Sequence, residues 1–260
     1  RFTGRSDFFS VLKKRVDNYF KENNISHHAN GAMVFKTIAI LALYFVPFLL
    51  LLLFPLSFNG ILLIYFIMGI GMAGIGMSIM HDAVHNSYSK SPIVNKWMGY
   101  SLNLMGGMVY NWRIQHNVLH HTYTNVHGMD DDIADKLVLR FSPHSELKGM
   151  HKFQYIYVFF FYSILTLYWV TAKDFVQQIR YLKNGASRAG DNAERNNLLK
   201  TIAIKLLYVF YTIVIPYWFF DYSFTQILCG FMLMHAVAGL ILGLIFQLAP
   251  VSYTHLTLPT

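Results

Sequence analysis

Cysteine and charged residues are scarce in this sequence, and both shortages narrow the kind of protein it can be. A single cysteine, Cys229, lies inside an apolar run, so the chain offers neither a disulfide framework nor a cysteine-based metal site. Charged residues make up 13% of the chain, about half of the share in soluble domains. Hydrophobic residues make up 55% and gather in runs such as residues 41–54. The composition excludes an ordinary soluble domain and predicts an all-α integral membrane protein.

Four apolar segments are long enough to cross the hydrocarbon core, which takes about 20 helical residues. Short turns join them as two hairpins. The predicted spans are 34–56 with 61–80, and 201–220 with 224–248. Two further segments, 92–110 and 155–172, are less apolar or rich in aromatic residues and are expected to lie at the interface. The predicted fold has four transmembrane helices in two hairpins, interfacial helices and a cytoplasmic cap that carries the histidines.

The distribution of Lys and Arg along the chain predicts which loops lie on the cytoplasmic side of the membrane. The net charge of +8 is concentrated beside the apolar spans, as in cytoplasmic loops of membrane proteins, and no nucleic-acid partner is expected. Residues 173–200 carry six Lys or Arg against three acidic residues. If segment 155–172 crossed the membrane, this basic stretch would lie outside. Four spans are therefore favoured, and the alternative is that one or both of the interfacial segments cross.

Histidines gather in two short clusters, which hold five of the chain's 12 histidines. His81 and His85 are four residues apart, a spacing that places both imidazoles on one face of a helix. His116 and His120 repeat the spacing, and His121 adds a neighbouring ligand. Two such clusters near the ends of apolar segments predict a metal centre, because ionisable groups at membrane depth are functional by default.

The identity of the metal follows from the ligand types. Imidazole suits zinc, copper, iron and nickel. A zinc protease would need a glutamate directly after the first histidine, but the residue there is Asp82. Five histidines also exceed the three protein ligands of a catalytic zinc. They suit a site with two metal ions, and iron is the natural choice for activating O₂ because zinc has no redox chemistry.

Three motifs carry a resemblance to a known family: HDAVHN at 81–86, NWRIQHNVLHHTYTN at 111–125 and GMDDD at 128–132. They resemble the membrane fatty acid desaturases, most closely the bacterial acyl-CoA or acyl-lipid enzymes related to front-end desaturases. The resemblance implies a non-haem centre of two iron ions held by three histidine boxes, with O₂ as co-substrate. The first two boxes fall on His81, His85, His116, His120 and His121.

The third box of the family, His-x-x-His-His, is not found in these residues. We therefore expect residues 1–249 to be an incomplete desaturase domain that is inactive as it stands. Residues 250–260, rich in Thr, Pro and Ser, are expected to be a non-native tail.

Four polar residues near the boxes are expected to orient the histidine rings by accepting their N–H groups: Asp82, Asn86, Asn125 and Asp130. Trp112 is expected either to line the route of substrate access or to anchor the chain at the interface. His235 lies in the last apolar segment, where it either lines an acyl tunnel or bonds to a neighbouring helix.

The resemblance also implies partners and a location. The substrate is an acyl-CoA or the acyl chain of a membrane lipid. Electrons come from a separate ferredoxin- or cytochrome-type donor. The expected location is a bacterial inner membrane with the histidine boxes on the cytoplasmic side. Two alternatives remain: a related di-iron hydroxylase or alkane monooxygenase, and a histidine-lined membrane protein that binds or transports metal.

Overall fold

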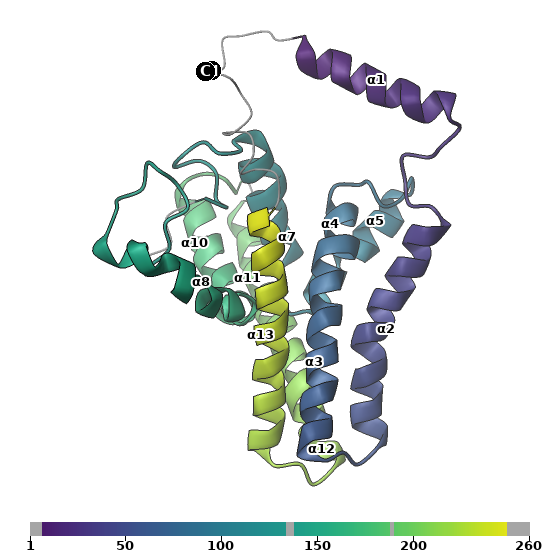
Figure 1. The fold of residues 1–260 in the computed structure, drawn as a ribbon, viewed down its shortest axis with the longest axis vertical. Helices are drawn as coiled ribbons and strands as arrows, with labels where there is room; N and C mark the ends of the chain where they lie inside the picture. Colours follow the sequence, from purple (N-terminus) through teal and green to yellow (C-terminus); the bar gives the residue numbers. More distant parts are fainter. Residues whose placement is uncertain (1–6, 134–137, 188–189, 249–260) are drawn as a thin grey trace.

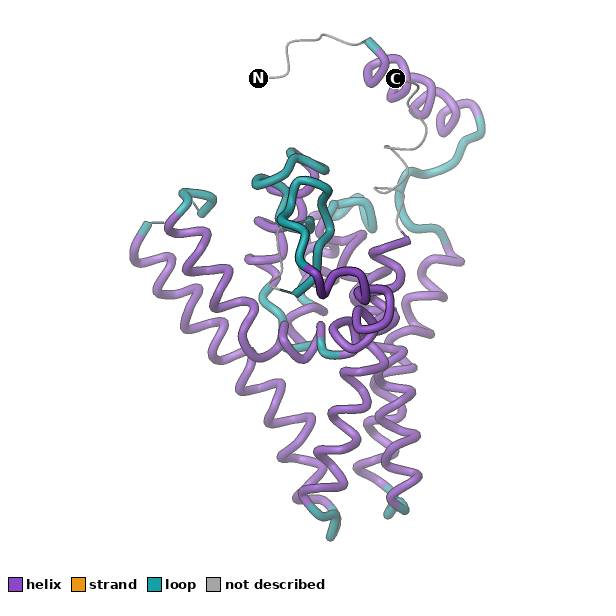
Figure 2. The backbone as a smooth tube through the Cα atoms, turned by 60° about the vertical axis from the view of Figure 1, so that its left-hand side comes forward, coloured by secondary structure: helices purple, strands orange, loops and turns teal. Residues whose placement is uncertain are grey.

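The computed structural model describes residues 7–133, 138–187 and 190–248, and its regular structure is helical throughout these ranges (Figure 2). Four helices in the described part are long and apolar enough to cross a membrane: Gly31–Leu53, Phe58–Val84, Asn192–Phe219 and Phe224–Gln247. The prediction of an all-α membrane protein with four spans is therefore confirmed. The expected tail, residues 250–260, lies outside the described residues.

The first hairpin consists of α2 (Gly31–Leu53) and α3 (Phe58–Gly74). Helix α3 continues through a π-helical turn, η1 (Ile75–Met80), into α4 (His81–Val84), so this span ends later than predicted and carries the first histidine on its last turn. The side chain of Asn30 caps the start of α2 by accepting the N–H of Met33.

The second hairpin consists of α11 (Asp191–Val209), η5 (Phe210–Val214) and α12 (Ile215–Phe219), followed by α13 (Phe224–Leu248). The turns of both hairpins lie at the same end of the bundle (Figure 1). There the hydroxyl of Tyr222 donates to the carbonyl of Phe54 at 3.0 Å and accepts the N–H of Leu56 at 2.9 Å. These two bonds join the second turn to the first.

Close packing of α3 between α2 and α13 forms the centre of the bundle. A Cβ added at Gly69 would lie 2.7 Å from the carbonyl oxygen of Met234 on α13. One added at Gly71 would lie 2.8 Å from the backbone nitrogen of Tyr44 on α2. Glycine is therefore required on both faces of α3, as is usual where membrane helices approach closely.

The two predicted interfacial segments fold differently from single helices. Segment 92–110 forms α5 (Pro92–Gly99), α6 (Ser101–Leu104) and the start of α7 (Val109–Trp112). Segment 155–172 belongs to a pair of helical stretches, Gly149–Ser163 and Leu165–Lys183, bent by 52°. This pair comprises η3 (Gly149–Phe153), α8 (Gln154–Ser163), α9 (Leu165–Tyr168), η4 (Trp169–Lys173) and α10 (Asp174–Lys183). It could cross only as a broken span, and its interfacial position stays a prediction.

One helix stands apart from the bundle. Helix α1 (Phe8–Glu22) has no buried residue and lies beyond the end of the bundle opposite the hairpin turns (Figure 1).

Candidate metal centre

The first histidine pair lies where the long helix α3–η1–α4 ends. His81 is on α4 and His85 is the residue that caps it. Their ring centroids are 4.6 Å apart. The four-residue spacing therefore places both rings on one side of the helix end, as predicted from the sequence.

The second cluster lies on a π-helical segment, η2 (Arg113–His120), that continues α7. A π-helix has more residues per turn than an α-helix, so residues five apart come onto one face. The Nε2 atoms of His116 and His121 are accordingly 3.3 Å apart. The rings of His116 and His120 stack, with centroids 5.5 Å apart and an interplanar angle of 14°. The sequence pattern predicted all three histidines of this cluster as ligands but did not predict the π-helical register that brings His121 beside His116.

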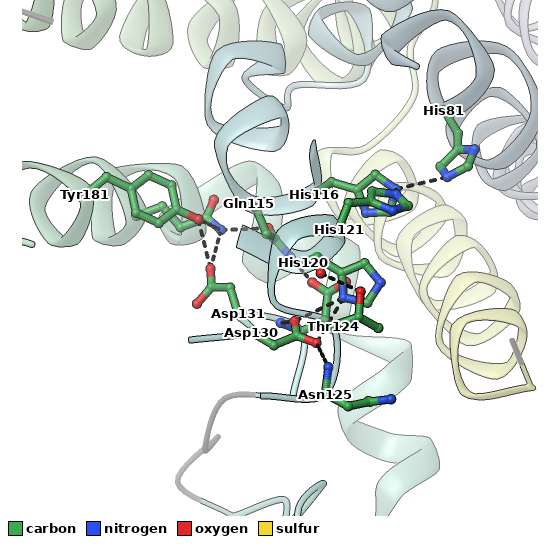
Figure 3. Close-up of polar contacts among 12 residues, drawn as sticks. His81, Gln115, His116, His120, His121, Thr124, Asn125, Asp130, Asp131 and Tyr181 are labelled. Atoms are coloured by element: carbon green, nitrogen blue, oxygen red, sulfur yellow. Dashed lines mark hydrogen bonds and ion pairs between the residues drawn. The ribbon is translucent and has the colours of Figure 1, made fainter. Parts of the chain in front are cut away.

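The two clusters meet at the end of the bundle opposite the hairpin turns. The Nε2 atoms of His81 and His116 are 3.0 Å apart (Figure 3). The rings of His85 and His121 have their centroids 4.7 Å apart. One nitrogen from each of His81, His85 and His116 fits a group of atoms that could hold a metal ion.

The nitrogens at this meeting point suit metal ligands. Two nitrogens bound to one ion at about 2.1 Å and at a right angle would lie about 3.0 Å apart, close to the observed separations. Nε2 of His85 and Nδ1 of His116 are buried without a hydrogen-bond partner among the described residues. Buried polar atoms are rarely left unpaired in a folded protein, so these two atoms are candidates to face a ligand.

Burial also keeps these rings uncharged. Burial, reinforced by the neighbouring histidines, lowers the pKa of His85 to about 4 and that of His116 to about 2. The pKa of His121 is lowered for the same reasons. A neutral imidazole is the form that binds a metal ion, so His85, His116 and His121 are in their binding form at neutral pH.

Two carboxylates hold the ring of His120. Its Nδ1 lies 3.0 Å from Oδ1 of Asp130, which is 1% exposed, and 3.3 Å from Oδ2 of Asp132. Oδ2 of Asp130 accepts the backbone N–H of Asn125 at 2.9 Å, and Asn125 adopts a φ of 63°. With Nδ1 held by carboxylates, Nε2 of His120 is the nitrogen left to bind a metal ion, an arrangement typical of metal-bound histidines. His116, His120 and Asp132 form a second group that could hold a metal ion.

A polar network that the sequence did not reveal supports this carboxylate pair (Figure 3). Gln115 donates to Oδ1 of Asp132 at 2.6 Å and accepts from Gln177 on α10 at 2.7 Å. Asp131 accepts from Tyr181, also on α10, at 2.8 Å. Gln115, Asp131 and Asp132 lie within the motifs, but Gln177 and Tyr181 lie far from them in the sequence and belong to no motif, so pattern analysis had no signal that joined the two groups.

The other predicted residues differ in how close they come to the histidines. The ring of Trp112 is buried and stacks on His116, with centroids 4.8 Å apart. Oδ1 of Asp82 lies 3.4 Å from Nδ1 of His81. Among the described residues, the side chain of Asn86 makes no hydrogen bond to these histidines, and a φ of 57° is what distinguishes this position. Of the residues expected to orient the rings, Asp130 makes the shortest contact.

His235 lies elsewhere, buried in the bundle. Its Nε2 is 2.9 Å from the hydroxyl of Tyr208 and its Nδ1 is 3.0 Å from that of Thr166. Both ring nitrogens are thus paired with neighbouring helices, which is the helix-contact alternative for this residue.

A small apolar cavity lies inside the bundle, between α3, α6, η4 and α13. Met72, Leu102, Met105, Trp169 and Leu242 are among its lining residues. Trp169 also lies against Trp112, with ring centroids 5.1 Å apart. The cavity is therefore linked to the histidines by a chain of ring contacts, from Trp169 in its lining to Trp112 and from Trp112 to His116.

This arrangement defines an integral membrane protein with a histidine-rich candidate metal centre. Residues 57–258 match the family model described as fatty acid desaturase, and the chain belongs to that family. The resemblance inferred from the three motifs is therefore confirmed.

Curated relatives of the same family align with nearly the whole chain. It is 31% identical over 255 residues to the sn-1 linoleoyl-lipid 6-desaturase of Synechocystis sp., covering 96% of this chain and 69% of that protein. It is 33% identical over 249 residues to the acyl-lipid (8-3)-desaturase of Physcomitrium patens, covering 94% and 51%. It is 30% identical over 258 residues to the Delta(5) fatty acid desaturase A of Dictyostelium discoideum, covering 97% and 54%. The chain thus spans from half to somewhat over two thirds of their lengths. No solved structure matches it.

Proposed function

We propose that this chain belongs to an O₂-dependent desaturase that introduces a double bond into the acyl chain of a membrane lipid. The observation that carries the proposal is the meeting of two histidine boxes, with Nε2 of His81 and His116 3.0 Å apart, beside an apolar cavity. The curated relatives are named as acyl-lipid or fatty acid desaturases, which favours a lipid-linked chain over acyl-CoA.

The metal centre is proposed to hold two iron ions. His81, His85, His116 and His121 would supply ligands to the iron ions. His120 would bind iron on the side of the site where Asp130 and Asp132 lie. When bound, the iron pair supplies the oxidising power for the reaction. One CH₂–CH₂ unit, O₂, two electrons and two protons give one CH=CH unit and two molecules of water.

The residues of this chain have three tasks in that reaction. The apolar residues that line the small cavity, including Met72 and Leu242, would contact a segment of the acyl chain and exclude water from it. Trp112 packs on the ring of His116 and limits its rotation. Asp130 accepts a hydrogen bond from Nδ1–H of His120, which leaves Nε2 of that ring free to bind the metal.

The partner and location follow from the same proposal. Electrons are supplied by a separate ferredoxin- or cytochrome-type donor that reaches the histidine end of the bundle. The basic excess of residues 173–200 supports our proposal that this end lies on the cytoplasmic side, and the membrane that we propose is a bacterial inner membrane.

The test uses the full-length protein that contains this chain, incubated with an isotopically labelled linoleoyl lipid, O₂ and a reductant. Mass spectrometry should show a product that has lost two hydrogen atoms. His85→Ala and His120→Ala should abolish it, whereas His127→Ala, at an exposed loop position, should not. A product that gains an oxygen atom would indicate the related hydroxylase instead. Retained desaturation in either box variant would refute the proposal.

A further inference from the structure

A buried ion pair lies beneath the second histidine box. Nζ of Lys205 on α11 is 2.8 Å from Oδ2 of Asp174 on α10. Lys205 is 8% exposed and Asp174 is not exposed at all. Lys205 belongs to one of the four spans, where an unpaired charge is costly, and charged residues retained at such depth are functional by default.

The charged groups of both residues also make hydrogen bonds to neighbouring segments. The ammonium group of Lys205 also donates to the carbonyls of Gly106 at 3.1 Å and Trp169 at 2.9 Å, so all three of its protons have acceptors. The carboxylate of Asp174 accepts the N–H of Met108 at 3.1 Å and the side-chain amide of Asn111 at 3.3 Å. The pair thus fixes the turn before α7, the start of η4 and α7 itself.

These anchored segments lead directly to the histidines. Asn111 is on α7, which continues without a break into the π-helix that carries His116 and His120. Trp169 is the residue whose ring lies against Trp112, and Trp112 stacks on His116. The ion pair therefore reaches the second box by two routes, one through the backbone of α7 and one through the two tryptophan rings.

We propose that Lys205 and Asp174 are positioning residues that set the register of the second histidine box. The ion pair holds α7 at a fixed height against α10 and α11, and this height determines where the π-helix presents His116. The inference rests on the proposed metal centre, but it concerns the order of residues 108–121 and can be measured without desaturation.

The decisive variant is Asp174→Leu with Lys205→Met in the whole chain. Apolar residues of similar size often replace a buried ion pair without loss of stability, so this variant should fold. It lacks the carboxylate that accepts from the N–H of Met108 and from the side-chain amide of Asn111, although the amide keeps its 3.0 Å bond to the backbone carbonyl of residue 174. Amide hydrogen exchange of residues 108–121, measured without metal, should be at least tenfold faster than in the wild type. Affinity for Co²⁺, followed by its visible absorption, should fall at least tenfold.

Two controls separate positioning from general stability. Lys200→Met removes an exposed lysine from the same helix and should change neither readout. Tyr208→Phe disturbs the buried part of α11 one turn beyond Lys205 and should lower the melting temperature while leaving Co²⁺ absorption unchanged.

Asn111→Ala keeps the ion pair and should still speed exchange in 108–121, which provides a test if the double variant does not fold. Unchanged exchange in the folded double variant or in Asn111→Ala would overturn the inference. Absence of Co²⁺ binding in the wild type would instead count against the metal centre.

Helix α1 carries a second, independent inference. Five of its seven large apolar side chains fall within an arc of about 100° on a helical wheel, and these five are exposed: Phe8, Phe9, Leu12, Val16 and Tyr19. Lys14 and Lys21 lie opposite this arc, and Lys13 and Arg15 border it. No residue of α1 is buried in the part of the chain that the structure describes.

The linker after α1 ties it to the first histidine box. The N–H of Ala29 donates to the carbonyl of Tyr88 at 3.1 Å, and Nδ1 of His28 lies 3.3 Å from the carbonyl of Ser87. The ring of Phe20 stacks on His27 at 4.1 Å. Helix α1 is therefore held at the histidine end of the bundle, and Figure 1 shows it lying across the direction of the spans.

We infer that the apolar face of α1 docks on an anionic lipid surface at the histidine end of the membrane domain. Apolar side chains enter the boundary between headgroups and acyl chains, while Lys13 and Arg15 at the borders of the arc meet negatively charged headgroups and Lys14 and Lys21 face water. The partner is a bilayer rather than a protein, because a continuous apolar stripe bordered by basic residues complements both the acyl and the anionic layers of such a surface.

A spin label tests this inference in the whole chain with Cys229→Ser. Nitroxides are placed at Leu12→Cys on the apolar face and at Asn18→Cys on the polar face, in vesicles of phosphatidylglycerol. The label at residue 12 should be accessible to oxygen and that at residue 18 to a water-soluble nickel chelate. Changing Lys13, Lys14 and Arg15 to Gln should reduce the difference, and pure phosphatidylcholine should do the same. Equal water exposure at both positions, or equal depth in both lipids, would overturn it.

Discussion

The Nε2 atoms of His116 and His121 lie 3.3 Å apart although the residues are five positions apart in the chain. On an α-helix, residues three or four apart share a face, whereas a π-helical turn brings residues five apart together. The π-helix η2 therefore adds His121 to a face that already carries His116. The second box contributes more than one ligand direction because of its backbone register.

His116 is common to both groups of atoms that could hold a metal ion, so its removal should affect both. We expect His116→Ala to remove most of the iron that the purified chain binds, as measured by elemental analysis. His144→Ala, at an exposed position, is the matched control and should bind as much as the wild type. Full iron content in His116→Ala would contradict the proposed site.

Asp130 should control metal affinity without being a ligand. Asp130→Asn replaces the buried carboxylate that accepts from Nδ1 of His120 and from the N–H of Asn125. Outer carboxylates of this kind contribute about 10–100-fold to metal affinity, so we expect a loss of that size in a Co²⁺ titration. Asp221→Asn, in the exposed turn of the second hairpin, should bind normally. A loss of the same size in that control would show a general charge effect instead.

Gly71 should be intolerant of even one extra methyl group. In Gly71→Ala the new Cβ would lie 2.8 Å from the backbone nitrogen of Tyr44, which cannot move aside as a flexible side chain could. Overpacking of this kind costs about 1–3 kcal/mol, so the melting temperature in detergent should fall. Gly31→Ala adds a Cβ with no atom within 4 Å and serves as the control. Equal melting temperatures for the two variants would refute the close approach of α2 and α3.

Tyr208 should stabilise the bundle through its bond to His235. Tyr208→Phe removes the hydroxyl 2.9 Å from Nε2 of His235, a residue with no exposed surface. Leaving a buried polar atom unpaired costs about 1–3 kcal/mol, which a thermal denaturation series in detergent can resolve. Tyr217→Phe alters an exposed tyrosine and should be neutral. If the two variants are equally stable, His235 does not depend on this bond.

The membrane fold could be predicted well because its signals are local. A run of about 20 apolar residues must form a helix in lipid, since every backbone polar group must be paired within the segment. Helix ends were less accurate: the predicted span 34–56 is Gly31–Leu53, and the second span runs on to Val84. Segment 155–172 is part of a helical pair bent by 52°, and its composition gave no sign of the bend.

In the candidate site, too, features within one segment could be predicted from the sequence, whereas contacts between segments could not. The spacing of His81 and His85 is a local feature, and their rings do share one side of a helix end. The 3.0 Å approach of His81 to His116 joins residues from two segments, which spacing within each segment cannot predict. The metal-binding role of all five histidines stays a prediction that the experiments above can test.

The sequence by itself determined that this is an all-α membrane protein of the fatty acid desaturase family, because apolar run length and histidine spacing are properties of single segments. Tertiary structure alone decided that Gln177 on α10 supports Gln115, and that Lys205 pairs with Asp174 beneath the second box. A buried amide or charge is tolerable only when a partner on another helix satisfies it. Such partners are chosen by the packing of helices, and no local pattern records that choice.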